Sequence, residues 1–251
     1  MDHIKAVFEK PIAHRGLHDA SSGVIENSID AFESAIAHGF AMECDVQLTG
    51  DDIPVVFHDQ RLDRLTDQHG KLSDISADQL CRIRLKGSAH TPQTFAQFLK
   101  HIDGRAPLIV ELKPQGSRNA IFAERVIEIA RSYKGPLVFK SFDPRILSAL
   151  HKKKCPFPIG IVVEAERPDG LTWSQAFALR NLLHLPYSHF QFISCNVSDL
   201  EMWPVKLLRK FGMRVMTWTV DKLDELHPAA QHADQIVFEG AVGQHLIECR
   251  A

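Results

Sequence analysis

The chain has 251 residues, of which 45% are hydrophobic and 24% are charged, and its formal net charge is −2. This is the composition of an ordinary globular protein with enough apolar material for a sizeable core. The near-neutral charge, with only a short basic run at residues 152–154, argues against a nucleic acid as the main partner.

The cysteines and the N-terminal residues predict a cytoplasmic protein. The five cysteines are scattered without a CxxC pair, a pattern that favours free thiols in a reducing compartment. Residues 1–16 carry charges throughout, unlike the apolar centre of a signal peptide. The sequence contains no apolar run of about 18 residues, so no membrane span is predicted.

Short apolar runs alternate with amphipathic stretches along the chain, the pattern of a parallel sheet covered by helices. The predicted strands, in chain order, span residues 11–14, 42–47, 107–113, 137–140, 159–163, 192–195, 214–218 and 235–238. Helices are predicted over residues 26–38, 94–102, 119–131 and 200–211. Eight strand–helix units in ~250 residues predict a single-domain α/β fold, a TIM-type (β/α)8 barrel over residues 1–251. A doubly wound open sheet is the alternative architecture.

A short extra run follows the second predicted strand. Residues 54–58 come after the turn signal Gly50-Asp51-Asp52, so we expect them to return beside that strand as in a hairpin. The pattern is irregular from residue 59 to about residue 91. We therefore predict a small insertion after strand two, over about residues 50–91, at one end of the barrel.

Charged side chains occur at the ends of the predicted strands, although a buried parallel strand should be nearly all apolar. Glu43 and Asp45 are two residues apart in the second strand, and Glu111 and Lys113 are two residues apart in the third. Side chains two apart on a strand point to the same face, so the members of each pair project together. The residues between them, Cys44 and Leu112, are then expected to face the covering helices.

Three carboxylates in one barrel mouth would repel one another unless a cation neutralised them. A donor set made only of oxygen favours Mg²⁺ or Ca²⁺ over zinc. We therefore predict that Glu43, Asp45 and Glu111 bind one divalent cation at the mouth, where the active sites of such barrels lie. The alternative is that they only form salt bridges with Arg15 and Lys113.

Two of the fourteen histidines differ from the rest because each follows a short apolar strand and adjoins a charged residue. His14 ends the first strand, and His58 ends the run at 54–58. A pair of imidazoles can supply one general base and one general acid near neutral pH. Together with a hard cation and the fixed charges of Arg15 and Lys113, such a pair suits displacement at phosphorus. No role is assigned to the other twelve histidines.

Five short motifs occur in order along the first half of the chain: IAHRG at 12–16, ENSIDAF at 26–32, ECDVQLT at 43–49, VVFHD at 55–59 and VELK at 110–113. Their order and spacing resemble the glycerophosphodiester phosphodiesterase family, and TPQTFAQFL, SFDP and WTVD resemble its later segments. The resemblance implies a barrel that cleaves small-molecule glycerophosphodiesters to sn-glycerol 3-phosphate and an alcohol. It also implies one divalent cation, typically Mg²⁺ or Ca²⁺.

The resemblance carries site roles over residue by residue. His14 and His58 match the acid/base pair. The positions that match metal ligands are Glu43, Asp45 and Glu111, and those that match phosphate-contacting or supporting groups are Arg15, Lys113 and Glu26.

The chain departs from the family pattern at two strand-end loops. Ile25 stands where a proline often precedes the EN pair, and Phe238-Glu239-Gly240 replaces a common Thr-Asp or Thr-Asn followed by proline. We expect these departures to leave the chemistry unchanged and to affect the substrate's alcohol end. Trp218, at the end of the seventh strand, is expected either to pack against the glycerol carbons of a substrate or to lie in the core.

Two other functions stay open at this point. One is a lyase of the phosphatidylinositol phospholipase C type, which would release a cyclic phosphate. The other is a non-catalytic phosphate-ligand binding protein, although the intact set of histidines and carboxylates argues against it. The sequence names neither the alcohol nor the oligomeric state.

Overall fold

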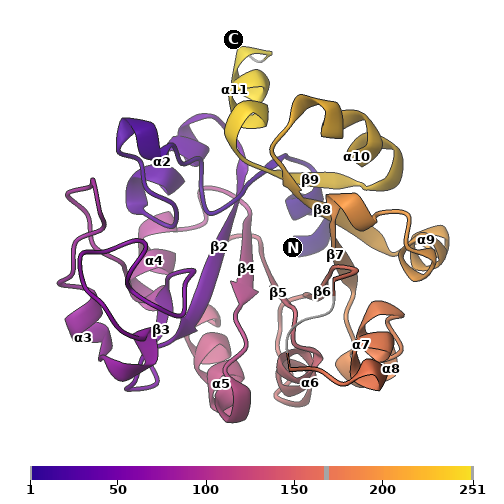
Figure 1. Ribbon diagram of the computed structural model, residues 1–251, viewed down its shortest axis with the longest axis horizontal. Helices are drawn as coiled ribbons and strands as arrows, with labels where there is room; N and C mark the ends of the chain where they lie inside the picture. Colours follow the sequence, from indigo (N-terminus) through magenta and orange to yellow (C-terminus); the bar gives the residue numbers. More distant parts are fainter. Residues whose placement is uncertain (1, 167–169, 250–251) are drawn as a thin grey trace.

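The computed structural model describes residues 2–166 and 170–249, and its strands form a closed parallel barrel (Figure 1). The barrel strands are β1 (Ile12–Ala13), β2 (Ala41–Leu48), β4 (Leu108–Leu112), β5 (Leu137–Ser141), β6 (Ile159–Val163), β7 (Phe192–Asn196), β8 (Arg214–Val220) and β9 (Gln235–Phe238). β1 pairs in parallel with both β2 and β9, and this double pairing closes the sheet. The predicted barrel is confirmed, and the open-sheet alternative is wrong because an open sheet leaves two edges unpaired.

Alternation along the strands separates two apolar layers. The outward residues of β2, which include Cys44, pack with Leu112 and the helices in the main core, as predicted. The inward residues form a smaller cluster inside the barrel, with members Ile12, Ala41, Ile109, Val138, Phe192, Met216 and Val237. The ring of Phe192 fills the space beside Gly160, where an added Cβ would lie 2.3 Å from it. The barrel is thus a packed core, and its free end is available for a site.

A short N-terminal helix, α1 (His3–Phe8), was not predicted from the sequence. Val7 is fully buried with the residues inside the barrel, and the Phe8 ring meets the Phe192 ring edge to face at 6.0 Å. Asp2 caps the helix by accepting a hydrogen bond from the Lys5 N–H. Because α1 packs on the apolar interior, it covers the end of the barrel that is opposite the polar strand ends.

The excursion after the second barrel strand is confirmed. β3 (Pro54–Val56) runs antiparallel to β2, and the short helices η2 (Leu72–Asp74) and α3 (Ala77–Leu80) follow it. This segment has an apolar cluster of its own, formed by Ile25, Val55, Phe57, Leu62, Leu65, Leu72, Ala77, Leu80 and Leu85. The cluster fixes the segment beside the barrel mouth, and it includes Phe57, the residue before His58.

The remaining helices surround the barrel (Figure 1). They are α2 (Ile29–Ala37), α4 (Phe95–Ile102), α5 (Asn119–Ala130), α6 (Pro144–Lys152), α7 (Trp173–Arg180), α8 (Leu185–Ser188), α9 (Trp203–Lys210), α10 (Leu226–His232) and α11 (Gly240–Glu248). The helix predicted over 26–38 begins only at Ile29, because Ser28 is its N-cap and Asn27 has a left-handed φ of +56°. In the described ranges, no helix has both the length and the apolarity needed to cross a bilayer.

Candidate active site

The loop after β1 is shaped by two left-handed residues. Arg15 has a φ of +53° and Gly16 has a φ of +80°. A Cβ at Gly16 would lie 2.8 Å from Ala31 of α2, so only glycine fits where the loop passes the helix. The left-handed Arg15 turns its own N–H toward β2, where it donates to Glu43 Oε2 at 3.1 Å. The HRG motif therefore contributes a backbone N–H to the site, through its left-handed conformation, as well as side chains.

Asn27 connects the next loop to β2. Its Nδ2 donates to Asp45 Oδ2 at 2.9 Å, and the Asp45 N–H donates to Asn27 Oδ1 at 3.2 Å. The Asn27 N–H also donates to the Arg15 carbonyl at 2.9 Å, which joins the two loops. Sequence analysis left Asn27 without a role, although the EN motif contained it. Its left-handed backbone and paired amide contacts fix the orientation of the Asp45 carboxylate.

The three predicted metal ligands are brought together. Glu43, Asp45 and Glu111 each offer an oxygen, and these atoms all lie within 4.8 Å of one another. The register explains the grouping, since Asp45 pairs with Glu111 across β2 and β4 while Glu43 lies two residues earlier on β2. All three are buried. A buried and closely grouped set of carboxylate oxygens fits a hard divalent cation.

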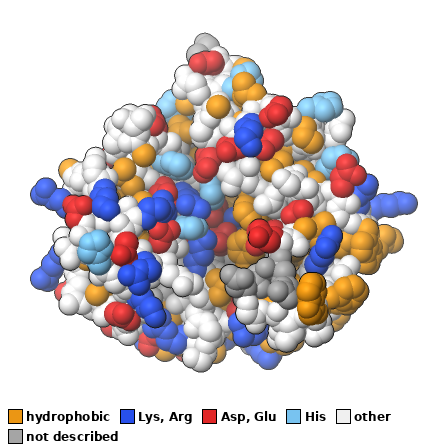
Figure 2. All heavy atoms as spheres, in the orientation of Figure 1, with side chains coloured by type: hydrophobic (Ala, Val, Ile, Leu, Met, Phe, Trp, Pro, Cys, Tyr) orange, Lys and Arg blue, Asp and Glu red, His pale blue; other side chains and the backbone are white. Residues whose placement is uncertain are grey.

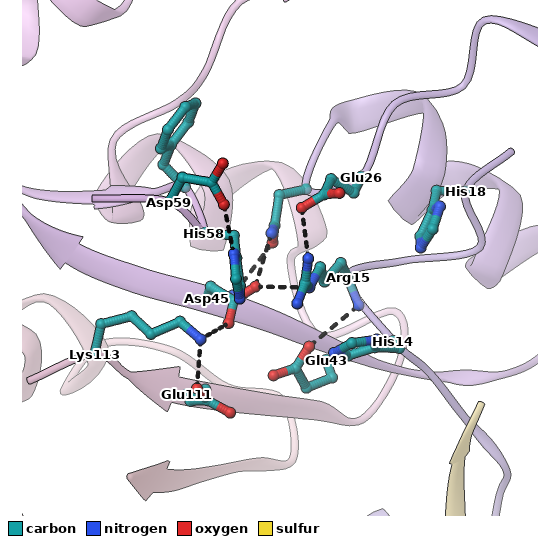
Figure 3. Close-up of polar contacts among 12 residues, drawn as sticks. His14, Arg15, His18, Glu26, Glu43, Asp45, His58, Asp59, Glu111 and Lys113 are labelled. Atoms are coloured by element: carbon teal, nitrogen blue, oxygen red, sulfur yellow. Dashed lines mark hydrogen bonds and ion pairs between the residues drawn. The ribbon is translucent and has the colours of Figure 1, made fainter. Parts of the chain in front are cut away.

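Three cations lie against the same carboxylates, and Figure 3 shows two of them, Arg15 and Lys113. Lys113 Nζ is 2.6 Å from Glu111 Oε1 and 2.8 Å from Asp45 Oδ1, and Arg15 Nε is 3.3 Å from Asp45 Oδ2. Burial alone would raise the pKa of Asp45, but Lys113 and the other nearby cations hold it far below its usual range. The pKa of Glu111 is lowered in the same way by Lys113 and Lys140. The lowered pKa values keep Asp45 and Glu111 ionised and able to bind a cation.

Lys140 of β5 is the third of these cations, and sequence analysis did not assign it. Its Nζ lies 3.2 Å from Glu43 Oε1 and 3.2 Å from Glu111 Oε2, inside the barrel. Burial would lower the pKa of Lys140, but the two carboxylates raise it above its ordinary value. A charge at the end of the apolar run LVFK was the same signal that singled out Glu43 and Glu111. This pattern marks Lys140 as a strand-end charge, and only the strand register shows which carboxylates it meets.

The two predicted histidines flank this cluster, and each has a carboxylate on Nδ1; Figure 3 shows the one between His58 and Asp59. His58 Nδ1 lies 2.7 Å from Asp59 Oδ1, and Arg64 donates to both oxygens of Asp59 at 2.7 Å. His14 Nδ1 lies 2.7 Å from Glu239 Oε2. In each ring the carboxylate orients the imidazole and leaves Nε2 for another partner.

Glu239 was not assigned a role from the sequence. It belongs to the departure at Phe238-Glu239-Gly240, which was expected to leave the chemistry unchanged, and it lies directly against His14. His18, one of the twelve histidines left without a role, places Nε2 3.5 Å from the same carboxylate oxygen. Hydrogen bonds from His14 and His18 hold the pKa of Glu239 well below its usual range. Glu239 is therefore an anionic partner of His14.

Glu26 and Trp218 are both engaged by protein partners. Glu26 accepts hydrogen bonds from Arg15 at 2.7 Å and from Arg64 at 2.6 Å. Because Arg64 also contacts Asp59, the partner of His58, Glu26 connects Arg15 to the His58 side of the site. Trp218 is half-buried at the end of β8, and its Nε1 donates to the Ser194 carbonyl at 3.0 Å. The Trp218 N–H is therefore already satisfied, and its ring packs against the apolar cluster inside the barrel.

Comparisons with known proteins agree with this geometry. The sequence profile of the glycerophosphoryl diester phosphodiesterase family matches residues 14–233. A glycerophosphodiester phosphodiesterase of Caldanaerobacter subterraneus subsp. tengcongensis is 27% identical over 86% of this chain and 87% of its own length.

Solved structures share the fold. A glycerophosphodiester phosphodiesterase from Parabacteroides distasonis superposes with a TM-score of 0.77 at 23% identity, covering 96% of this chain and 97% of that one. An Oleispira antarctica phosphodiesterase in complex with the product sn-glycerol-3-phosphate gives 0.76 at 24% identity, with coverages of 94% and 96%. Because the family profile covers most of the sequence, the chain belongs to the glycerophosphoryl diester phosphodiesterase family of hydrolases.

Proposed function

We propose that the protein hydrolyses glycerophosphodiesters to sn-glycerol 3-phosphate and an alcohol, with one bound divalent cation and a pair of histidines. In this reaction a water oxygen bonds to phosphorus, the P–O bond to the alcohol breaks, and the alcohol leaves with a proton. The observation that carries the proposal is the grouping of Glu43, Asp45 and Glu111 within 4.8 Å, flanked by two carboxylate-oriented histidines. The product bound to the Oleispira antarctica relative agrees with this substrate class.

The cation is proposed to bind Glu43, Asp45 and Glu111. We expect Mg²⁺ or Ca²⁺, since every donor is a carboxylate oxygen. When bound, such an ion polarises a phosphoryl oxygen and stabilises charge in the transition state. The cations Arg15 and Lys113 already adjoin the same carboxylates, so they are suited to contact the remaining phosphoryl oxygens.

His14 and His58 are proposed to move the two protons. With Nδ1 held by Glu239 or Asp59, each ring directs Nε2 toward the reacting groups. One imidazole takes a proton from the attacking water and the other gives a proton to the departing alcohol. Glu26, which accepts from Arg15, would then position that guanidinium, and the Trp218 ring would pack on the glycerol carbons.

A product assay tests the proposed function. Purified protein should convert sn-glycero-3-phosphocholine or another glycerophosphodiester to sn-glycerol 3-phosphate in Mg²⁺ or Ca²⁺, and exhaustive chelation should stop the reaction. A cyclic phosphate as the final product would favour the lyase alternative. Lack of turnover on several glycerophosphodiesters in either metal would overturn the proposal.

Lys140 provides a second test, through stability. Lys140→Met removes a buried ammonium from between Glu43 and Glu111, so the metal-free protein should lose about 3–5 kcal/mol of unfolding free energy. Added Mg²⁺ or Ca²⁺ should restore part of this loss, because the ion supplies the missing positive charge. Urea unfolding in chelator and in metal measures both quantities.

The matched control for Lys140 is Lys153→Met. Lys153 forms an exposed ion pair with Glu124 at 2.7 Å, so its loss should cost about 1 kcal/mol or less in either buffer. Equal destabilisation of the Lys140 variant with and without metal would show that Lys140 has only a packing role.

The cytoplasm remains our proposal for the location of the protein. It is supported by the five cysteines, all of which are free thiols in the structure.

A further inference from the structure

An apolar cavity lies between β6 and α7, beside the polar mouth of the barrel. Its volume is about 520 Å³, within the range of small-molecule pockets. The walls come from Phe142 after β5, from Ile161 and Val163 of β6, and from Trp173 and Phe177 of α7. A second cavity of about 380 Å³ adjoins it and shares Phe142, Leu179 and His184 with it.

Helix α7 covers this space without filling it. None of the residues Trp173–Arg180 is buried, whereas α5 and α6 bury several residues each on the same barrel. Trp173 is 80% exposed and Phe177 is 62% exposed although both also line the cavity. Figure 2 shows hydrophobic side chains gathered on this part of the surface, over α7 and α9. The apolar space therefore continues from the protein surface to the barrel.

The cavity lies at the same end of the barrel as the proposed active site. Its wall residues Phe142 and Glu164 directly follow β5 and β6. Phe142 also meets the Trp218 ring edge to face at 5.4 Å. Pro114, the residue after Lys113, lines the adjoining second cavity.

The wall is largely apolar, but Glu164, Glu166, Arg180 and His184 also line it. His184 lines both cavities, and within the described ranges its Nε2 is buried without a hydrogen-bond partner. The Ser188 hydroxyl donates to the His184 carbonyl, so its oxygen is left to accept from His184 Nδ1–H. In that tautomer Nε2 is an acceptor, ready for a hydroxyl of a ligand. A largely apolar cavity with a few polar groups is typical of a ligand pocket.

We infer that the cavity under α7 binds a hydrocarbon chain of the substrate, so that the enzyme prefers phosphodiesters in which one substituent carries such a chain. The inference rests on the proposed function, because the chain must be attached to the phosphodiester that the mouth cleaves. Most of the lining side chains are apolar, so a free glycerol group would leave most of its hydroxyls without partners there. A chain of several methylenes would instead gain free energy from leaving water.

Two pairs of probes, used below their micelle concentrations, test the inference. The first pair is sn-glycero-3-phosphoethanol and sn-glycero-3-phospho-octanol, and the second is sn-glycero-3-phosphocholine and its 1-octanoyl form. The chain-bearing member of at least one pair should show kcat/KM roughly 10- to 100-fold higher, since each buried methylene adds to transition-state binding. The pair that responds identifies whether the chain belongs to the alcohol or to the glycerol.

A cavity-filling variant makes the test specific. Ala176→Phe places a ring in the first cavity, and it should reduce the ratio between long and short probes toward one while short-probe turnover persists. The control Ala230→Phe adds the same ring on exposed α10, away from both cavities, and should keep the wild-type ratio. Ratios near one for the wild-type enzyme on both pairs, with short probes cleaved, would overturn the inference. Failure to cleave any probe would instead count against the proposed function.

Discussion

Glu111→Gln should remove most of the divalent-cation affinity and lower kcat/KM by roughly 10²- to 10³-fold, the several kcal/mol that a metal contributes to such a transition state. The amide keeps the size of the side chain but takes one of three negative charges from the cluster with Glu43 and Asp45. Titration calorimetry with Mg²⁺ and Ca²⁺ measures the affinity, and the release of sn-glycerol 3-phosphate measures the rate.

The control for this experiment is Glu124→Gln, which removes a carboxylate from an exposed ion pair far in sequence from the strand ends. It should keep wild-type affinity and rate. The substitution also removes a charged partner from Lys113 and Lys140, so it can destabilise the fold. Unfolding curves of Glu111→Gln therefore distinguish a folding defect from a loss of metal binding. Wild-type metal affinity in the Glu111 variant would show that Glu111 is not a ligand, and the proposed metal site would then be wrong.

Much of the fold was predictable because the barrel strands keep a period of two. In β2 the outward residues Met42, Cys44, Val46 and Leu48 are apolar, and the inward residues include Glu43 and Asp45. The alternation along this one strand therefore predicts both the residues that face the core and the residues that face the site. Helix ends were less predictable. The start of α2 depends on the left-handed backbone of Asn27 and on the Ser28 cap, which are details of turn geometry.

The parts of the site that sequence analysis missed depend on contacts between distant strands. Glu239 meets His14 only because β9 pairs with β1 across the closure of the barrel. Lys140 meets Glu111 because the two residues are paired in the register of β4 and β5. No single-sequence pattern reports such registers. The cavity under α7 is even harder to predict from the sequence, because it depends on how closely the helix packs against the barrel.

The two histidines should give the largest losses of rate. His14→Ala and His58→Ala should each lower the rate roughly 10²- to 10⁴-fold, the usual contribution of a positioned proton-transfer group, while exposed His69→Ala should have no effect.

The wild-type pH–rate profile should be bell-shaped, with limbs that belong to the coupled pair. The charged or titratable groups that face the histidines are Glu239 and His18 on the His14 side, and Asp59 and Arg64 on the His58 side. We propose that His14 is the base. A base must be unprotonated to act, so the His14 variant should lose the acidic limb of the profile and the His58 variant the basic limb.

A nitrophenyl phosphodiester separates the two roles, because its leaving group departs without a proton. It should restore much of the activity of the His58 variant and almost none of that of the His14 variant. The opposite pattern would exchange the roles of the two residues. Near-normal rates on sn-glycero-3-phosphocholine for both variants would show that neither ring transfers a proton in the rate-limiting step. The orientation of their Nδ1 atoms by Glu239 and Asp59 would then be structural only.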